Sequence, residues 1–209
     1  MRFWGGLVGS LMFDSGYMLL SDDDINGEIY SFNQIEKSIS FIEKYFDSIG
    51  IKRDFFVFCK NIILFPGKKS SDDELNLSSK KEEILAKMLF TAEQLGQMSD
   101  RIYLEKLLFL YYELHNANIS IYKSELDLLK KTLKLYGSTI EKLSKEYDSL
   151  YKFMVEHFRV RWNIPNDLYM EAIDKNIKYL KFVLENHESS YRDYLRRGNI
   201  IDKISLLSG

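Results

Sequence analysis

Hydrophobic residues recur at steps of three and four along most of this chain, the spacing of a helix with one apolar face. In residues 32–48 and at the position just after them, the repeating apolar residues are Ile35, Ile39, Ile42, Phe46 and Ile49. Similar patterns predict helices at about 53–64, 84–95, 104–114, 123–136, 139–159, 167–186 and 189–196. No alternating segment long enough for a strand interrupts them. The predicted fold class is all-α.

Residues that favour helix ends lie between these segments. The expected caps are Ser31 with Gln34, Ser79 with Glu82, Asn166, Gly137 and Gly198. The two Ser pairs have the spacing of a capping box, Asn is a good N-cap, and Gly is common just past a helix end. The polar stretch at 67–81 follows a Phe-Pro-Gly break and predicts a surface loop.

The composition is that of an ordinary soluble globular protein, with 45% hydrophobic and 29% charged residues in 209. A net charge of −2 gives no general attraction to nucleic acid or to anionic lipid. The single cysteine, Cys59, excludes an intrachain disulfide framework and lies in an apolar stretch, which favours a packed thiol in a reducing compartment. The apolar opening is short and is followed by Asp22–Asp24, so we expect neither a signal peptide nor a membrane span. The predicted location is cytoplasmic.

Several catalytic motifs are missing from the sequence: a Walker loop, G-x-G-x-x-G, H-E-x-x-H, C-x-x-C and G-x-S-x-G. The three histidines, His115, His157 and His187, have no second His or Cys at ligand spacing. We interpret them as solvated or hydrogen-bonded side chains rather than metal ligands.

A series of longer segments resembles a known superfamily. They are "LMFDSGYM" at 11–18, "SFNQIEKSISFIEKYF" at 31–46, "MLFTAEQLGQMSDRIYLEKLLFLYYEL" at 88–114, "YKSELDLLKKTLKLY" at 122–136, "HFRVRWNIPNDLYMEAIDKNIKYL" at 157–180 and "YRDYLRRGNI" at 191–200. In this order they resemble a subgroup of the HD-domain metal-dependent phosphohydrolases, which are all-α. The resemblance implies a site where histidines and aspartates hold divalent metal ions that activate water and neutralise a phosphoryl group.

The resemblance also assigns residues to that site. Asp14 takes the place of the aspartate in the His-Asp pair, but Phe13 stands where the histidine is expected. Gln34 replaces a further histidine, and Glu93 corresponds to the closing aspartate. A histidine upstream of the pair would precede Met1, and all three histidines of this chain follow Glu93, so none corresponds to a family ligand.

Three interpretations follow from these replacements. The first is a degenerate member that has lost hydrolysis and acts as a binding or regulatory protein, with no cofactor. The alternative is an active phosphohydrolase of nucleotides or phosphoesters, with weakly bound Mg²⁺ on Asp14 and Glu93 and the amide of Gln34 nearby. A relic with no selected activity is a third reading.

The resemblance divides the chain into an HD-like core at 1–118, lacking its first helix, and a C-terminal extension at 119–209 packed on that core.

Arginines in the second half form a second candidate site. Arg159, Arg161, Arg196 and Arg197 could bind a phosphate group through forked contacts, as in a nucleotide or phosphoester ligand. The alternative is that they and Arg192 complement helix dipoles, or pair with Glu113, Glu125, Asp127 and Asp167. The apolar stretch at 102–122 predicts either a deeply buried helix or a contact between subunits of a homo-oligomer. We expect no nucleic acid and no membrane among the partners.

Overall fold

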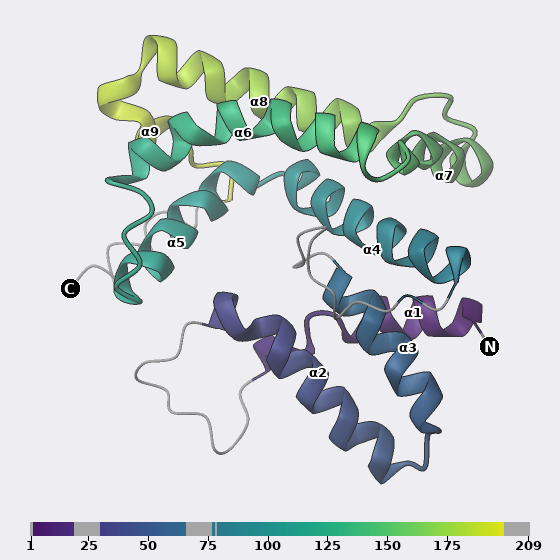
Figure 1. Cartoon of the computed structure of the whole chain (residues 1–209). Coiled ribbons are helices and arrows are strands. Elements are labelled where there is room, and N and C mark those ends of the chain that lie inside the picture. Colours follow the sequence, from purple (N-terminus) through teal and green to yellow (C-terminus); the bar gives the residue numbers. More distant parts are fainter. Residues whose placement is uncertain (1, 19–29, 66–76, 78, 199–209) are drawn as a thin grey trace. The chain divides into compact units, whose positions relative to one another are not determined.

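The computed structural model describes residues 2–18, 30–65, 77 and 79–198 (Figure 1). These residues form helices joined by turns and loops, and no strand occurs among them, so the fold class is all-α. The chain divides into two compact units, Met1–Phe90 and Thr91–Gly209, and the division falls within helix α4 (Lys80–Ser99). The sequence-based division between an HD-like core at 1–118 and an extension at 119–209 is a different statement, and it stays a prediction.

The first unit contains α1 (Arg2–Met12), the 3₁₀ turn η1 (Ser15–Tyr17), α2 (Tyr30–Ser48), α3 (Arg53–Leu64) and the start of α4. Helix α3 has the predicted bounds. Helix α1 packs on α3, while η1 and α3 both pack on α2. The buried core is formed by Phe13, Ile42, Phe46, Phe56, Cys59 and Ile63. Two of these, Ile42 and Phe46, belong to the predicted apolar stripe of α2.

Cys59 lies fully buried in this core, as the sequence predicts for a packed thiol. Its Sγ lies 3.7 Å from the backbone oxygen of Gly5 on α1. Burial raises the pKa of the thiol to about 12, so the reactive thiolate is scarce at neutral pH.

The second unit contains the rest of α4, followed by α5 (Tyr103–Asn116), α6 (Glu125–Lys145), η3 (Leu150–Phe153), α7 (Met154–Trp162), α8 (Leu168–Asn186), η4 (Glu188–Ser190) and α9 (Tyr191–Tyr194). Helices α6 and α8 run side by side, and α5 packs on both (Figure 1). The core is rich in leucine: Leu104, Leu107, Leu108, Leu128, Leu129, Leu180, Leu184 and Leu195.

An ion pair with one buried member joins segments of this unit that lie 67 residues apart in the sequence. The side chain of Glu125, only 4% exposed, accepts hydrogen bonds from Arg192 Nε at 2.8 Å and Nη2 at 2.7 Å. The hydroxyl of Tyr191 also donates to Glu125, and Arg192 Nη2 reaches the hydroxyl of Tyr112 at 2.7 Å. Burial and the Glu125 carboxylate raise the pKa of Tyr191 to about 12. Glu125 and Arg192 thus pair as one of the sequence-based alternatives expects.

Three predicted helix ends are wrong. Gly137 lies inside α6, which continues to Lys145. The break between the helices predicted at 123–136 and 139–159 therefore comes after Lys145, and α7 begins at Met154. The N-cap of α8 is Asp167 rather than Asn166, since the Asp167 carboxylate accepts from the N–H groups of Tyr169 at 3.0 Å and Met170 at 3.1 Å. Gly198 lies beyond α9, whose C-cap is Leu195.

The two predicted capping boxes differ in outcome. Ser79 caps α4, because its Oγ accepts from the N–H of Glu82 at 3.3 Å. Ser31 lies inside α2, which begins at Tyr30, so it is not the N-cap. Most of the predicted loop at 67–81 lies outside the described residues.

The predicted buried face of helix α4 is only partly correct. The apolar spacing predicts burial of one side of this helix, formed by Ile84, Leu85, Met88, Leu89, Ala92 and Leu95. Of the predicted positions, Leu95 is buried, whereas Met88 is 46% exposed and Ala92 is exposed. Ala86 and Phe90, which the prediction left out, are buried. No helix in the described part of the chain is long and apolar enough to cross a membrane.

Replacing the cap of α8 tests the corrected boundary. We expect Asp167→Ala to lower the free energy of unfolding by about 1 kcal/mol, because two helix N–H groups lose their acceptor. The matched control is Asn166→Ala, which removes only an exposed 2.9 Å contact to Glu171 and should change stability by less than about 0.5 kcal/mol. Urea denaturation measures both, and a larger loss in Asn166→Ala would contradict the assignment.

Candidate functional site

Asp14 lies at a tight turn where α1 gives way to η1. Helix α1 ends at Met12, and Asp14 is the residue before the 3₁₀ turn that starts at Ser15. The turn is closed locally, because Ser15 Oγ donates to the Met12 carbonyl at 2.7 Å and the N–H of Tyr17 donates to the Asp14 carbonyl at 3.1 Å. The backbone carbonyl of Asp14, rather than its carboxylate, therefore supports the turn.

Two polar side chains of α2 hold this turn in place. Gln34 Nε2 donates to the carbonyl of Phe13 at 2.5 Å and to Asp14 Oδ1 at 3.2 Å. Ser38, one helical turn later, donates from its Oγ to the same Phe13 carbonyl at 2.6 Å and accepts from the N–H of Gly16 at 2.8 Å. Gln34 and Ser38 are both buried, so these bonds satisfy groups that water does not reach.

Gly16 is required by this close approach. A Cβ atom at Gly16 would lie 2.0 Å from the backbone oxygen of Gln34 and 2.8 Å from the backbone nitrogen of Ser38. Both atoms belong to the α2 backbone, which cannot yield as a flexible side chain would. The glycine of the "DSGY" motif is therefore fixed by packing against α2.

The ring of Phe13 belongs to the core of the first unit. It is 6% exposed and packs in the cluster that contains Ile42, Phe46 and Cys59. At the position where the resemblance expects an imidazole ligand, the chain thus places a packed hydrocarbon ring.

More than a third of the surface of Asp14 is exposed to solvent. The surrounding turn nevertheless shields part of its carboxylate from water. This partial burial raises the pKa of Asp14 above its ordinary value of 3.8. A raised pKa means that the folded protein favours the neutral acid more than the unfolded chain does.

Glu93, the other predicted carboxylate ligand, lies in the part of α4 that belongs to the second unit. Its Oε1 accepts from Gln97 Nε2, four residues later, at 3.1 Å. The structure brings Gln34 to Asp14 and assigns Glu93 to the other unit, so the pairing of Asp14 with Glu93 stays a prediction.

The four arginines predicted to bind phosphate lie on two different elements of the second unit. Arg159 and Arg161 are on α7, where Arg159 pairs with Glu156 and Arg161 lies 5.1 Å from the ring of Trp162. Arg196 and Arg197 follow α9, and α7 and α9 lie at opposite ends of α8 (Figure 1). Arg196 pairs with Asp193 at 3.2 Å. All four are exposed.

Two of the other predicted acidic partners are engaged elsewhere. Asp127 pairs with Lys131 at 2.9 Å, and Asp167 caps α8. The histidines mainly contact aromatic rings: His187 stacks on Tyr194 with centroids 3.8 Å apart, and His157 packs on Trp162 at 5.1 Å. Among the described residues, no group of three or more His, Cys, Asp or Glu side chains is placed to hold a metal ion.

Sequence reasoning missed Ser38 and Gly16 as parts of this site. A signal was present, because Gln34 and Ser38 are polar residues four apart beside the apolar stripe of α2. Two polar residues at that spacing on a buried face indicate a buried polar partner.

Comparisons with known proteins return no match: no family, no curated protein and no solved structure is similar enough to this chain to be reported.

Substituting Gly16 tests the packing of η1 on α2. We expect Gly16→Ala to lower the free energy of unfolding by about 3 kcal/mol, because the new methyl group overlaps two backbone atoms of α2. Gly137→Ala is the control, since a Cβ there has no neighbour within 4 Å and alanine favours a helix interior. It should raise the free energy of unfolding by about 0.5–1 kcal/mol. Equal effects of the two changes on thermal unfolding would contradict the packing.

The raised pKa of Asp14 predicts how stability depends on pH. Ionising Asp14 costs more in the folded state than in the unfolded one, so this cost appears as pH rises through the folded-state pKa. We expect Asp14→Asn, which keeps an oxygen acceptor for Gln34, to be more stable than wild type at pH 7. The difference should vanish below the ordinary pKa of 3.8, as urea titrations from pH 3 to 7 can show. A less stable Asn variant at pH 7 would mean that the ionised form is held favourably.

Proposed function

We propose that this chain is a binding or regulatory protein, related to the HD-domain phosphohydrolases, that does not hydrolyse phosphoesters. The observation that carries the proposal is the bond from Gln34 Nε2 to Asp14 Oδ1. The amide N–H of Gln34 donates to a carboxylate oxygen that a bound cation would otherwise use as a ligand.

Three further features of the turn support the proposal. The Phe13 ring is packed in the core and supplies no ligand atom. The same Gln34 nitrogen also bonds the Phe13 carbonyl, so the amide is fixed at two points. Partial burial raises the pKa of Asp14 above its ordinary value, so a proton competes with a cation for this carboxylate better than it does at a fully solvated aspartate. The groups gathered around Asp14 therefore do not fit a divalent cation.

The second candidate is a phosphohydrolase with a reduced Mg²⁺ site on Asp14 and Glu93. The exposure of Asp14 favours it, since an accessible carboxylate leaves room for a cation that keeps most of its water ligands. The two candidates differ in turnover and in the effect of removing Asp14.

An activity assay separates these candidates. We expect no hydrolysis of nucleoside triphosphates or of p-nitrophenyl phosphate above the protein-free rate with Mg²⁺, Mn²⁺, Co²⁺ or Ni²⁺, because Asp14 is held by an amide and no imidazole accompanies it. Asp14→Ala and Glu93→Ala should give the same background rate as wild type. Metal-dependent turnover that both variants abolish would refute the proposal and establish the phosphohydrolase.

A further inference from the structure

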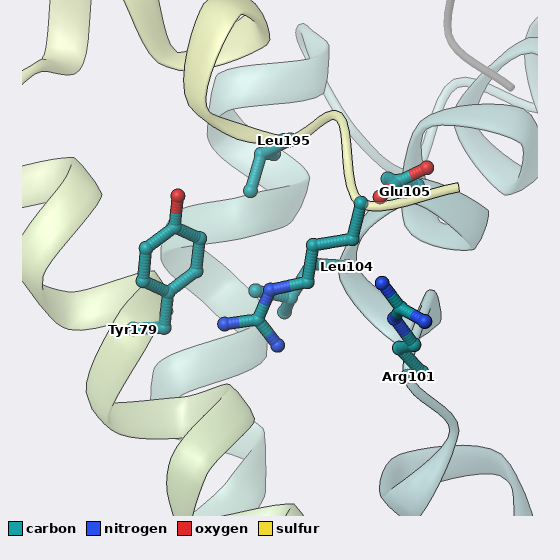
Figure 2. A pocket seen from close by; sticks show the side chains of 6 residues that line it. Arg101, Leu104, Glu105, Tyr179 and Leu195 are labelled. Atoms are coloured by element: carbon teal, nitrogen blue, oxygen red, sulfur yellow. The ribbon is translucent and has the colours of Figure 1, made fainter. Parts of the chain in front are cut away.

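A small pocket lies in the second unit between the start of α5, the middle of α8 and the segment after α9. It is lined by Arg101, Leu104, Glu105, Tyr179, Leu195 and Arg197. Figure 2 shows Arg101 and Glu105 on one side and Tyr179 across from them. Its enclosed part has a volume of about 10 Å³, which admits one water-sized group such as a single ligand oxygen.

The guanidinium of Arg197 is held in place at this pocket. It lies 4.4 Å from the centroid of the Tyr179 ring, and its Nη1 donates to Asn176 Oδ1 at 3.2 Å. Asn176 is itself fixed, since its Nδ2 donates to the carbonyls of Met98 and Asp100 at 2.9 Å each. The Arg197 guanidinium is thus oriented before any ligand arrives. Among the described residues its other N–H groups have no hydrogen-bond acceptor, so they can donate to a ligand.

Arg101 supplies a second cation to the lining. Its side chain is exposed, and within the described part of the chain it makes no hydrogen bond, ion pair or ring contact. A guanidinium with five unused donors on the wall of a pocket suits a planar or tetrahedral oxyanion.

Glu105 places one negative charge near these arginines. Its carboxylate is buried, and both oxygens accept from the N–H of Gly198, at 2.8 and 2.9 Å. No ion pair within 4.0 Å joins it to Arg101 or Arg197 in the described structure. The charged groups of the lining therefore sum to one net positive charge, with two guanidinium groups not neutralised by direct contact.

We propose that this pocket binds a phosphoryl group, either inorganic phosphate or the terminal phosphate of a monoester, between Arg101 and Arg197. One phosphoryl oxygen enters the enclosed space, and the rest of the group lies at its open mouth. Of the four arginines that the sequence indicates, this site uses Arg197 and replaces the other three by Arg101. The inference does not depend on the proposed function, because all of its residues lie in the second unit and no hydrolysis is involved.

Calorimetric titration tests the site with two probes, inorganic phosphate and phenyl phosphate, in low-salt buffer at pH 7.5. We expect wild type to bind at least one of them saturably, and Arg101→Ala to weaken that binding about tenfold, the loss of one charge-assisted contact. Arg197→Lys keeps the charge but loses the fork, and it should weaken binding as well. Tighter binding of inorganic phosphate would point to the free anion, and tighter binding of phenyl phosphate would point to a monoester.

Two matched variants distinguish this site from general surface charge. Arg161→Ala removes an exposed arginine on α7 and should leave binding unchanged. Glu105→Gln keeps an acceptor for the Gly198 N–H while removing the negative charge, so it should strengthen binding. Circular dichroism confirms that each variant is folded. Absence of saturable binding in wild type, or equal losses in Arg101→Ala and Arg161→Ala, would overturn the proposal.

Discussion

The carbonyl of Phe13 is the point on which the candidate site depends. It accepts from Gln34 Nε2 and from Ser38 Oγ, two buried donors one turn apart on α2. Since buried donors without partners cost about 1–3 kcal/mol each, these bonds fix the end of α1 against α2. With this carbonyl in place, the ring of Phe13 lies in the core, Gly16 contacts the α2 backbone, and the Asp14 carboxylate lies beside the Gln34 amide.

The second unit uses buried charge in a related way. Glu125 is paired with Arg192 from the far end of the unit's sequence, and Glu105 receives the N–H of Gly198. In both cases a carboxylate on or at the start of a core helix ties down the segment around α9. Each contact supplies hydrogen bonds to a buried carboxylate, which would otherwise be left without a partner away from water. The same arrangement positions Arg197 beside Arg101, where the phosphoryl site is proposed.

Helices were predictable wherever the apolar period was long, and their ends only where one residue dominated. The bounds of α3 follow from a clear apolar run that ends at a Phe-Pro-Gly break. Gly137 misled the prediction because a glycine inside a helix costs only about 1 kcal/mol, which the buried Leu128, Leu129 and Leu143 of α6 outweigh. Asn166 and Asp167 are both good caps, and the sequence does not show which side chain reaches the helix N–H groups.

Two residues of the turn, Asp14 and Gln34, were named from the sequence, but Ser38, Gly16 and the contacts among them were not. The resemblance selected Asp14 and Gln34, and the structure places these two side chains 3.2 Å apart although 20 residues separate them. What the sequence could not show is that Gln34 presents its nitrogen rather than its oxygen, since that choice depends on the Phe13 carbonyl. It also could not show which arginine joins Arg197, because Arg101 is 96 positions away in the chain and meets it only through the fold.

The central claim is that an amide, and not a cation, occupies the inner side of the Asp14 carboxylate. A crystal structure of the protein soaked in millimolar Mn²⁺, with anomalous data, tests this most directly. The account predicts no anomalous peak within about 2.5 Å of the Asp14 carboxylate and an intact bond from Gln34 Nε2. A well-occupied ion coordinated by Asp14, with the Gln34 amide turned away, would contradict it.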